Sequence, residues 1–424
     1  YIEHLVRIEL RGLRADEQLR LVEARLGVHD GVSAACAELV PRVAGNPFFL
    51  LEMVDALLER GILEIREQAS GQILVKTDKS ADPLRALPST LEQLIADRLI
   101  DLPAEERGVV RWLAVAGGPL RLDDLLKVGN LESEEPVARL CARGTCDRRG
   151  DTIDFRHPIA RDVAYSSIEK NVAVSMHIRL GEYLATTELA SGLSAVIIAR
   201  HFVRGLDTHR AADYYFEAAQ AARSSYQTQL AIKYYRRVLE WAHDDPSRRL
   251  RAHEALESVY RILGNHRERR LHLTAIRSIA QESSNPQWVA LALTRTAVFT
   301  LDEGFLSKCV PIARRACEAT RLTGMAGLEV VALSTLGEAL RELGDVQGSL
   351  DACDRALEVS KHPKVQPRIR ADVLRSRGVL LRRVGRVQEA VDCYADAIAV
   401  FRKVGARRLE ARAKNALAFA LFVL

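Results

Sequence analysis

The sequence predicts a mainly α chain, and three observations carry this prediction. Only 5% of the 424 residues are aromatic, while Ala, Leu and Arg recur at helical spacing, and such a composition favours packed helices over sheet sandwiches. With 48% hydrophobic residues the chain is long enough to form two or three separate cores. In its second half, Gly recurs at a regular interval, which indicates a repeat architecture.

The turns of the repeat are marked by Gly264, Gly304, Gly344 and Gly385, at intervals of about 40 residues. Each Gly stands where one helix must end and the chain reverse, a left-handed position that Gly adopts without steric cost. Small residues follow each turn, such as Ala390, and allow two helices to approach closely. The pattern resembles the tetratricopeptide repeat family with a lengthened repeat, which implies an α-solenoid superhelix.

We expect this repeat array to occupy residues 210–424, after linking helices over residues 171–209. The stretch around Tyr226 matches the second helix of a repeat but lacks the turn Gly, so it is interpreted as a degenerate repeat. The stretch from Glu410 matches a first helix whose partner is missing. The array is therefore expected to be truncated, and the chain to be a fragment of a longer protein.

The concave groove lined by the first helices is the usual binding surface of such arrays, so a protein or peptide partner is expected there. Arg261, Arg341 and Arg382 each stand three residues before a turn Gly, which would place them in a row along the groove. Two interpretations remain open. The three are ordinary solvated residues, as is usual on exposed helices, or they form a row that captures an acidic ligand.

The first 170 residues have no such period and are predicted to form two smaller parts. Residues 1–80 contain an alternating strand pattern at His4–Leu10, helices and a hairpin, and residues 87–170 contain helices closed by a second hairpin, as in a winged helix. The candidate recognition helix, Glu134–Leu140, begins with acidic residues where phosphates would approach. Direct nucleic acid binding is therefore not expected.

Three segments together resemble the STAND class of signal-transduction ATPases: Gly45–Phe49, the helix Leu87–Arg98 and Phe155–Tyr165. The resemblance implies that residues 1–80 are the edge strand and helical lid of an AAA-type ATPase. A winged helix and a sensor array would follow. The complete expected fold is thus a helical lid and winged helix followed by a tetratricopeptide-like superhelix.

In that family, a Gly-x-Pro motif of the lid packs its Pro against adenine. The matching positions here are Gly45, Asn46 and Pro47. The resemblance therefore implies that these residues contact a nucleotide when the ATPase core is present.

The family's Met-His-Asp motif ends the winged helix, and its His touches the phosphates of ADP; the matching residue is His157. An imidazole N–H donated from a separate domain to a phosphate would latch that domain in place. The sequence departs from the motif with Arg156 and Pro158 in place of Met and Asp. The alternative is that His157 is a capping or packing residue at the start of a helix led by Pro158.

No complete enzyme active site is found in the chain, and no catalytic residue or metal site is predicted. None of its 25 Gly is followed by Lys, so the phosphate-binding loop is missing and the ATPase core is expected upstream of Tyr1. ADP or ATP is expected in the full-length protein, without tight binding to this part alone. Seven scattered Cys and the lack of a long apolar run favour a reducing cytoplasm and no membrane contact.

The sequence therefore predicts the regulatory and sensor part of a nucleotide-switched bacterial signalling protein, which binds a partner in the groove and holds the ATPase closed. The texture of the repeats, notably Gly378–Ala390, is most similar to large bacterial serine/threonine kinases. LuxR-type transcription regulators and nucleotide cyclases of the same architecture remain alternatives. A scaffold without a nucleotide switch is a further alternative.

Overall fold

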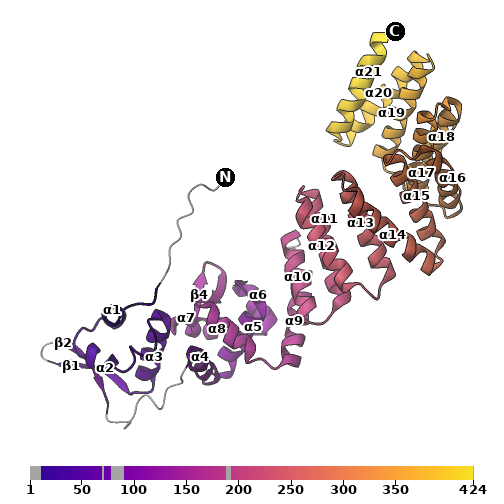
Figure 1. Ribbon diagram of the computed structural model, residues 1–424. Helices are drawn as coiled ribbons and strands as arrows, with labels where there is room; N and C mark the ends of the chain where they lie inside the picture. The colour runs from indigo at the N-terminus through magenta and orange to yellow at the C-terminus, as the bar shows by residue number, and fades with distance from the viewer. Residues whose placement is uncertain (1–10, 69–70, 78–89, 188–191, 424) are drawn as a thin grey trace. The chain divides into compact units, whose positions relative to one another are not determined.

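The computed structural model describes residues 11–68, 71–77, 90–187 and 192–423 (Figure 1). The strand predicted at His4–Leu10 lies outside these residues. The mainly α prediction is confirmed, because the described residues form 21 helices and only five short strands. Within this described part of the chain, no helix is both long and apolar enough to cross a membrane.

The chain divides into two compact units, which are described separately. Unit 1 comprises Tyr1–Leu189 and Arg200–Asp207, and unit 2 comprises Ala190–Ala199 and Thr208–Leu424. Helix α10 (Gly192–Arg204) contributes residues to both.

The first part of unit 1 is a small helical layer closed by a two-stranded hairpin. Its elements are α1 (Ala15–Leu26), α2 (Val32–Cys36), α3 (Pro47–Glu59), β1 (Leu63–Gln68) and β2 (Gly71–Lys76). The strands pair antiparallel, with Leu63 opposite Lys76. The apolar residues Leu50, Met53 and Val54 of α3 are fully buried, so α3 provides the core of this layer.

The second part of unit 1 has the element order that the sequence predicted, helices followed by a hairpin. Its elements are α4 (Leu91–Ile100), α5 (Ala104–Ala116), β3 (Leu120–Arg121), α6 (Leu122–Gly129), α7 (Glu135–Ala142), β4 (Cys146–Arg149), β5 (Thr152–Phe155), α8 (Pro158–Ser166) and α9 (Lys170–Thr186). Strand β5 lies between β3 and β4 in an antiparallel sheet. Leu113, Leu125, Leu140 and Ile153 are fully buried and form the core between these helices and the sheet.

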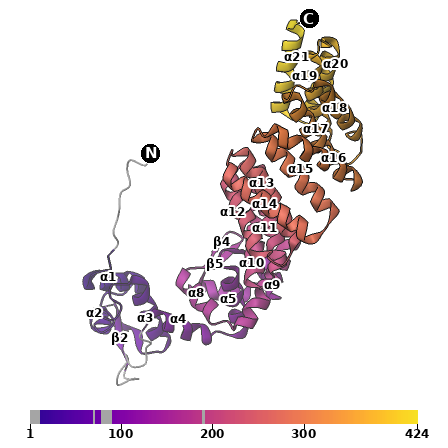
Figure 2. The same ribbon diagram turned by 45° about the vertical axis from the view of Figure 1, so that its right-hand side comes forward.

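Unit 2 is a succession of antiparallel helix pairs, which lie side by side in chain order in both views (Figures 1 and 2). After the end of α10, its helices are α11 (Thr208–Ser224), α12 (Thr228–Trp241), α13 (Pro246–Ile262), α14 (His266–Ser283), α15 (Pro286–Asp302), α16 (Leu306–Leu322), α17 (Ala326–Glu342), α18 (Val346–Val359), α19 (Pro367–Arg383), α20 (Val387–Lys403) and α21 (Arg407–Val423). Consecutive helices pack on each other, and α15, α17, α19 and α21 also form a contacting series. We call these odd-numbered helices, together with α11 and α13, the first helices.

The turns of unit 2 explain the glycine period. Backbone φ angles at the four predicted turn glycines are positive, from 66° at Gly264 to 87° at Gly344. Two further glycines, Gly324 and Gly405, adopt the same conformation in the turns between successive helix pairs. The turns between α12 and α13 and between α18 and α19 have no residue with positive φ, so the turn within each pair is the one that gives the regular glycine signal.

The degenerate first pair follows the same backbone rule without Gly. At its turn, Tyr226 has a positive φ of 59°, and its side chain is 92% exposed. The amide of Gln227 donates to the carbonyl of Ala222 at 2.8 Å. This bond matches the 3.0 Å bond from Asn265 to Tyr260 at the Gly264 turn. The turn geometry is thus retained where the sequence signal is missing.

Candidate functional site

The predicted nucleotide-contacting triplet builds the start of α3. Gly45 has a φ of 79°, and a Cβ there would meet the carbonyl oxygen of Leu13 at 2.8 Å, so only Gly fits. The Asn46 side chain accepts hydrogen bonds from the amides of Phe48 and Phe49 at 3.0 and 3.2 Å. Pro47 occupies the first turn and is exposed. Each residue therefore has a structural reason for its place, since an N-cap and a following Pro start a helix.

The structure brings this motif into contact with the second predicted motif. The ring of Phe48 lies on the imidazole of His157, with 3.7 Å between ring centroids. His157 precedes Pro158 at the start of α8 and makes no capping hydrogen bond. Burial lowers the pKa of His157, against an opposing effect of Glu52. The imidazole is therefore neutral at neutral pH, with one N–H to donate.

A small cavity of about 40 Å³ lies beside this ring contact. Arg98 lines the cavity and donates hydrogen bonds to two carboxylates of α3, Glu52 and Glu59, the latter at 2.6 Å. Arg143 also lines the cavity and donates to the buried carboxylate of Glu106 at 2.8 Å. A water molecule takes up about 30 Å³ in the liquid, so the cavity has room for a group the size of a phosphate oxygen.

These observations test whether the described residues fit the nucleotide that the family resemblance implies. Among the described residues, no hydrogen bond is recorded for the His157 imidazole, and Pro47 presents an exposed ring. Both features fit contact with a nucleotide. The cavity is too small to hold adenine and ribose as well.

Helix α7, the predicted recognition helix, has its cations engaged within unit 1. Arg139 donates to Glu106 at 2.7 Å, as does Arg143 from the end of the helix. Arg148 on β4 pairs with Glu134 at 2.9 Å. These side chains thus neutralise acidic neighbours, whereas a DNA-reading helix would direct them to phosphates.

Unit 2 contains a groove with a volume of about 1020 Å³. Its walls come mainly from the first helices α15, α17 and α19, with contributions from α13 and α21. Of the three predicted groove arginines, Arg261 and Arg341 line it. Arg382 is not among its lining residues and instead lies over the Phe419 ring, at 4.6 Å. The predicted row of three is therefore incomplete.

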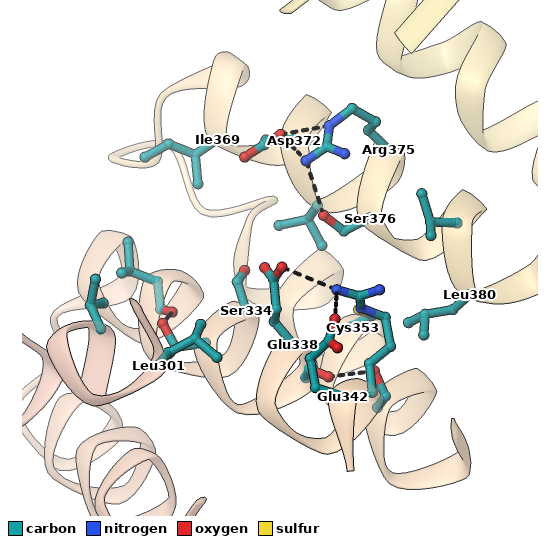
Figure 3. Close-up of a pocket in the computed structure, with 18 of the residues that line it drawn as sticks. Leu301, Ser334, Glu338, Glu342, Cys353, Ile369, Asp372, Arg375, Ser376 and Leu380 are labelled. Atoms are coloured by element: carbon teal, nitrogen blue, oxygen red, sulfur yellow. Dashed lines mark hydrogen bonds and ion pairs between the residues drawn. The ribbon is translucent and has the colours of Figure 1, made fainter. Parts of the chain in front are cut away.

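Ion pairs between residues of the same helix line the groove (Figure 3). On α17, Arg341 pairs with Glu338 at 3.3 Å and with Glu342. On α19, Arg375 pairs with Asp372 at 2.8 Å. In the pairs Arg341–Glu338 and Arg375–Asp372, the carboxylate is at least half exposed while the guanidinium is mostly buried. These pairs therefore present mainly their carboxylates to an occupant.

Cys353 also lines the groove, from α18. Burial raises the pKa of its thiol to about 12. Cys353 is therefore a protonated thiol at neutral pH and is not activated as a nucleophile.

One end of the groove rests on a buried ion network. Arg269 is 2% exposed, and its Nε lies 2.6 Å from a carboxylate oxygen of the fully buried Glu257. A second nitrogen of Arg269 lies 2.8 Å from Asp302, which also accepts from Arg261 at 2.8 Å. The network joins α13, α14 and α15, and its outer members Arg261 and Asp302 face the groove.

Sequence reasoning missed several groove residues, among them Glu338, Arg368, Asp372, Arg375 and Arg412. A usable signal was present, since Glu338 and Arg341 are three positions apart on one helix face. Alignment of all the first helices on their turn glycines would have shown which faces carry paired charges.

A family model described as a domain of unknown function, DUF8739, matches residues 14–70, which is a small part of the chain. Among curated proteins, none matches.

Solved structures similar to this chain include a STAND protein with a tetratricopeptide repeat sensor from Pyrococcus horikoshii. Its identity is 13% and its TM-score 0.42, and the match covers 97% of this chain and 63% of that one, so this chain spans less than two thirds of that protein. Aspartyl phosphate phosphatase F from Bacillus subtilis matches at 13% identity and a TM-score of 0.40, covering 76% of this chain and 94% of that one. The pilF protein of Pseudomonas aeruginosa matches at 17% identity and a TM-score of 0.35, and the match covers 49% of this chain and 90% of that one.

Proposed function

We propose that unit 2 binds a protein or peptide partner in its groove. The observation that carries this proposal is one cavity of about 1020 Å³ that runs along the first helices of successive repeats. Small-molecule pockets typically occupy about 300–1,000 Å³, so the groove lies at the upper limit of that range. Its wall combines ion pairs with aliphatic side chains, a mixture that suits a polypeptide segment better than a small metabolite.

The ion pairs of the wall can be exchanged at low cost. Glu338 and Arg341 are three residues apart on α17, as are Asp372 and Arg375 on α19. Such pairs stabilise a helix by only about 0.2–0.5 kcal/mol. Charged groups of a partner could therefore replace them without destabilising the array.

Selection of random displayed peptides on the whole chain tests this proposal. The groove is blocked by Ser334→Trp on α17, and Ser225→Trp, outside the cavity at an exposed turn, is the matched control. We expect selected peptides to bind the wild type and the control equally and the blocked variant at least about tenfold more weakly, which is about 1.4 kcal/mol. Peptides that are indifferent to Ser334→Trp would refute the groove as the binding surface.

We further propose that unit 1 is a nucleotide-responsive latch, with ADP or ATP bound by an ATPase core in cis. The support is the contact between Phe48 at the start of α3 and His157 at the start of α8. The neutral imidazole can donate its N–H to an oxygen while Phe48 fixes the ring plane. A bound nucleotide would supply the phosphate oxygen that accepts this bond. A groove ligand that prefers one state of the latch would shift the balance by its differential affinity.

ADP titration of a chain extended upstream through the ATPase core tests the latch. His157→Ala removes both the ring and the donor, whereas His157→Phe keeps an aromatic ring against Phe48 and removes only the donor. Both variants are expected to lose about tenfold or more in ADP affinity, the value of a charge-assisted hydrogen bond. Unchanged affinity in both would make His157 structural and favour the scaffold alternative.

The output that we propose for the complete protein is a serine/threonine kinase. A transcription regulator or a cyclase with the same regulatory architecture is the alternative. Intact Walker motifs upstream of Tyr1 would argue against a pure scaffold, since a scaffold needs no phosphate-binding loop.

A further inference from the structure

Charge is distributed very unevenly along the array. Residues 361–424 contain 15 Lys and Arg against 5 Asp and Glu, although the formal net charge of the whole chain is only +5. Helix α19 carries six Arg and one Asp, and α21 carries four basic residues and one Glu. Helix α17, in contrast, carries one Arg and three Glu. Since α17, α19 and α21 are all first helices, the groove changes from acidic to basic along its length.

Two of these cations line the groove and have no partner among the residues that the structure describes. Arg368 on α19 and Arg412 on α21 both line the cavity and are exposed. For the residues that the structure describes, no ion pair or hydrogen bond is recorded for either side chain. Each guanidinium presents five N–H donors in a geometry that matches a carboxylate. The basic end of the groove is thus equipped to accept anionic side chains.

Aliphatic residues line the same cavity as the two arginines. Ile369 on α19 and Leu409 on α21 line the same end of the cavity and are partly exposed. Burying such side chains against a partner contributes about 25 cal/mol per Å² of apolar surface. The complementary segment therefore combines carboxylates with aliphatic side chains.

Nucleic acid fits this end of the groove less well. The cavity includes the carboxylates of Glu338, Glu342 and Asp372, which repel a phosphate backbone. Among the described lining residues there is no aromatic ring, whereas single-stranded nucleic acid is usually bound by stacking its bases on aromatic side chains. Both observations favour a protein segment.

We propose that the α19–α21 end of the groove binds an acidic, aliphatic segment of a partner protein, with Arg368 and Arg412 receiving its carboxylates. The acidic part of this partner segment lies against α19 and α21. Neutral or basic residues of the same segment face Glu338 and Glu342 of α17. This inference rests on the proposed partner-binding function and adds the chemistry and the direction of the partner.

Fluorescence anisotropy with two labelled peptides of equal length tests it on the whole chain. One probe alternates Glu with Leu, and the other replaces every Glu by Lys. The groove variant is Arg368→Glu with Arg412→Glu. The matched control is Arg383→Glu with Lys403→Glu, which changes the net charge equally at exposed positions outside the cavity. Circular dichroism checks that both variants keep the wild-type helical signal.

The Glu probe is expected to bind the wild type at least about tenfold more tightly than the Lys probe, and this preference should reverse in the groove variant. The control should change the affinity for the Glu probe by no more than about twofold. The variant Arg368→Lys with Arg412→Lys should retain most of the wild-type affinity for this probe. Equal losses in groove variant and control would reduce the effect to bulk charge and overturn the proposal. A single-stranded oligonucleotide that binds more tightly than the Glu probe, and depends on Arg368 and Arg412, would also overturn it.

The random-peptide selection separates this inference from the function on which it rests. If selected peptides depend on Ser334 but are not acidic, partner binding stands and the acidic chemistry is wrong. If no selected peptide depends on Ser334, both fail.

Discussion

Phe48 on α3 and His157 at the start of α8 are far apart in the sequence, yet their rings lie 3.7 Å apart between centroids. Aromatic pairs of this kind contribute about 0.5–1.5 kcal/mol beyond the burial of their area. We expect His157→Ala to lower the free energy of unfolding of unit 1 by about 1 kcal/mol, measured by urea denaturation. His157→Phe should leave stability nearly unchanged. If His157→Ala costs nothing, the ring contact does not stabilise the unit.

The buried network of unit 2 predicts a large and non-additive effect. Arg269→Met leaves the carboxylate of Glu257 buried without its main partner, a change that typically costs about 3–5 kcal/mol. Adding Glu257→Met removes the stranded charge, so the double variant should be more stable than Arg269→Met alone. Chemical denaturation of both variants checks this. If the double variant is less stable than both the wild type and Arg269→Met, the pair itself provides net stability.

Two histidines predict a pH dependence. The Nδ1 atoms of His253 on α13 and His272 on α14 lie 2.9 Å apart, so at least one ring must be neutral. Burial lowers the pKa of both to about 4, and the neighbouring Arg249 and Arg236 act in the same direction. Below the ordinary His pKa of about 6.5 the unfolded chain therefore binds more protons than the folded chain, and stability falls as the pH is lowered toward 4.

Urea midpoints measured between pH 7 and pH 4 check this dependence. In the variant His253→Gln with His272→Gln, the decline over the same range should be smaller. An equal decline in wild type and variant would assign the pH dependence to other groups.

The left-handed turn at Tyr226 predicts a stabilising substitution. A non-Gly residue in this conformation costs about 1–2 kcal/mol, part of which the greater freedom of Gly in the unfolded chain offsets. Tyr226→Gly should therefore raise stability by about 0.5–1 kcal/mol, because the side chain is 92% exposed and little packing is lost. Thermal melts compare it with Tyr226→Ala, which keeps the strained backbone and should not gain. An equal gain in stability in Tyr226→Gly and Tyr226→Ala would mean that removal of the Tyr side chain, and not relief of backbone strain, causes the gain.

Two glycines at equivalent repeat positions should respond differently to alanine. A Cβ at Gly378 would lie 2.7 Å from the ring of Tyr394, a fully buried residue, whereas at Gly337 the nearest atom would be 3.4 Å away. Overpacking typically costs about 1–3 kcal/mol, so Gly378→Ala should be clearly destabilising and Gly337→Ala nearly neutral. Denaturant midpoints measured side by side distinguish them, and similar losses would mean that the two helix pairs pack equally tightly.

The sequence predicted the backbone of the array better than its surface. Gly264 and its equivalents mark turns because a left-handed residue is a local requirement, and local requirements leave a local signal. Gly324 and Gly405 mark turns between successive pairs, and they stand outside the 40-residue period of the four predicted turn glycines. Tyr226 left no such signal, because its turn has the same left-handed conformation without a Gly.

The candidate sites depended on packing that periodicity does not encode. The family resemblance pointed to Pro47 and His157, but the residue that touches His157 is Phe48, whose contact requires α3 and α8 to meet. Likewise, Arg382 shares its place before the turn Gly with Arg341 but lies over Phe419. Which side of a first helix faces the groove depends on the rotation of each helix pair, and no single repeat specifies this.

Packing between neighbouring helices in unit 2 has a consequence for how the chain is made. Each helix pair gains most of its contacts from segments within about 40 residues along the chain, so little of its structure waits for distant sequence. Pairs near α11 can form while α21 is still being synthesised on the ribosome, because domains assemble from the N-terminal side during translation. A helix pair completed early in synthesis therefore offers a packing surface to the next pair.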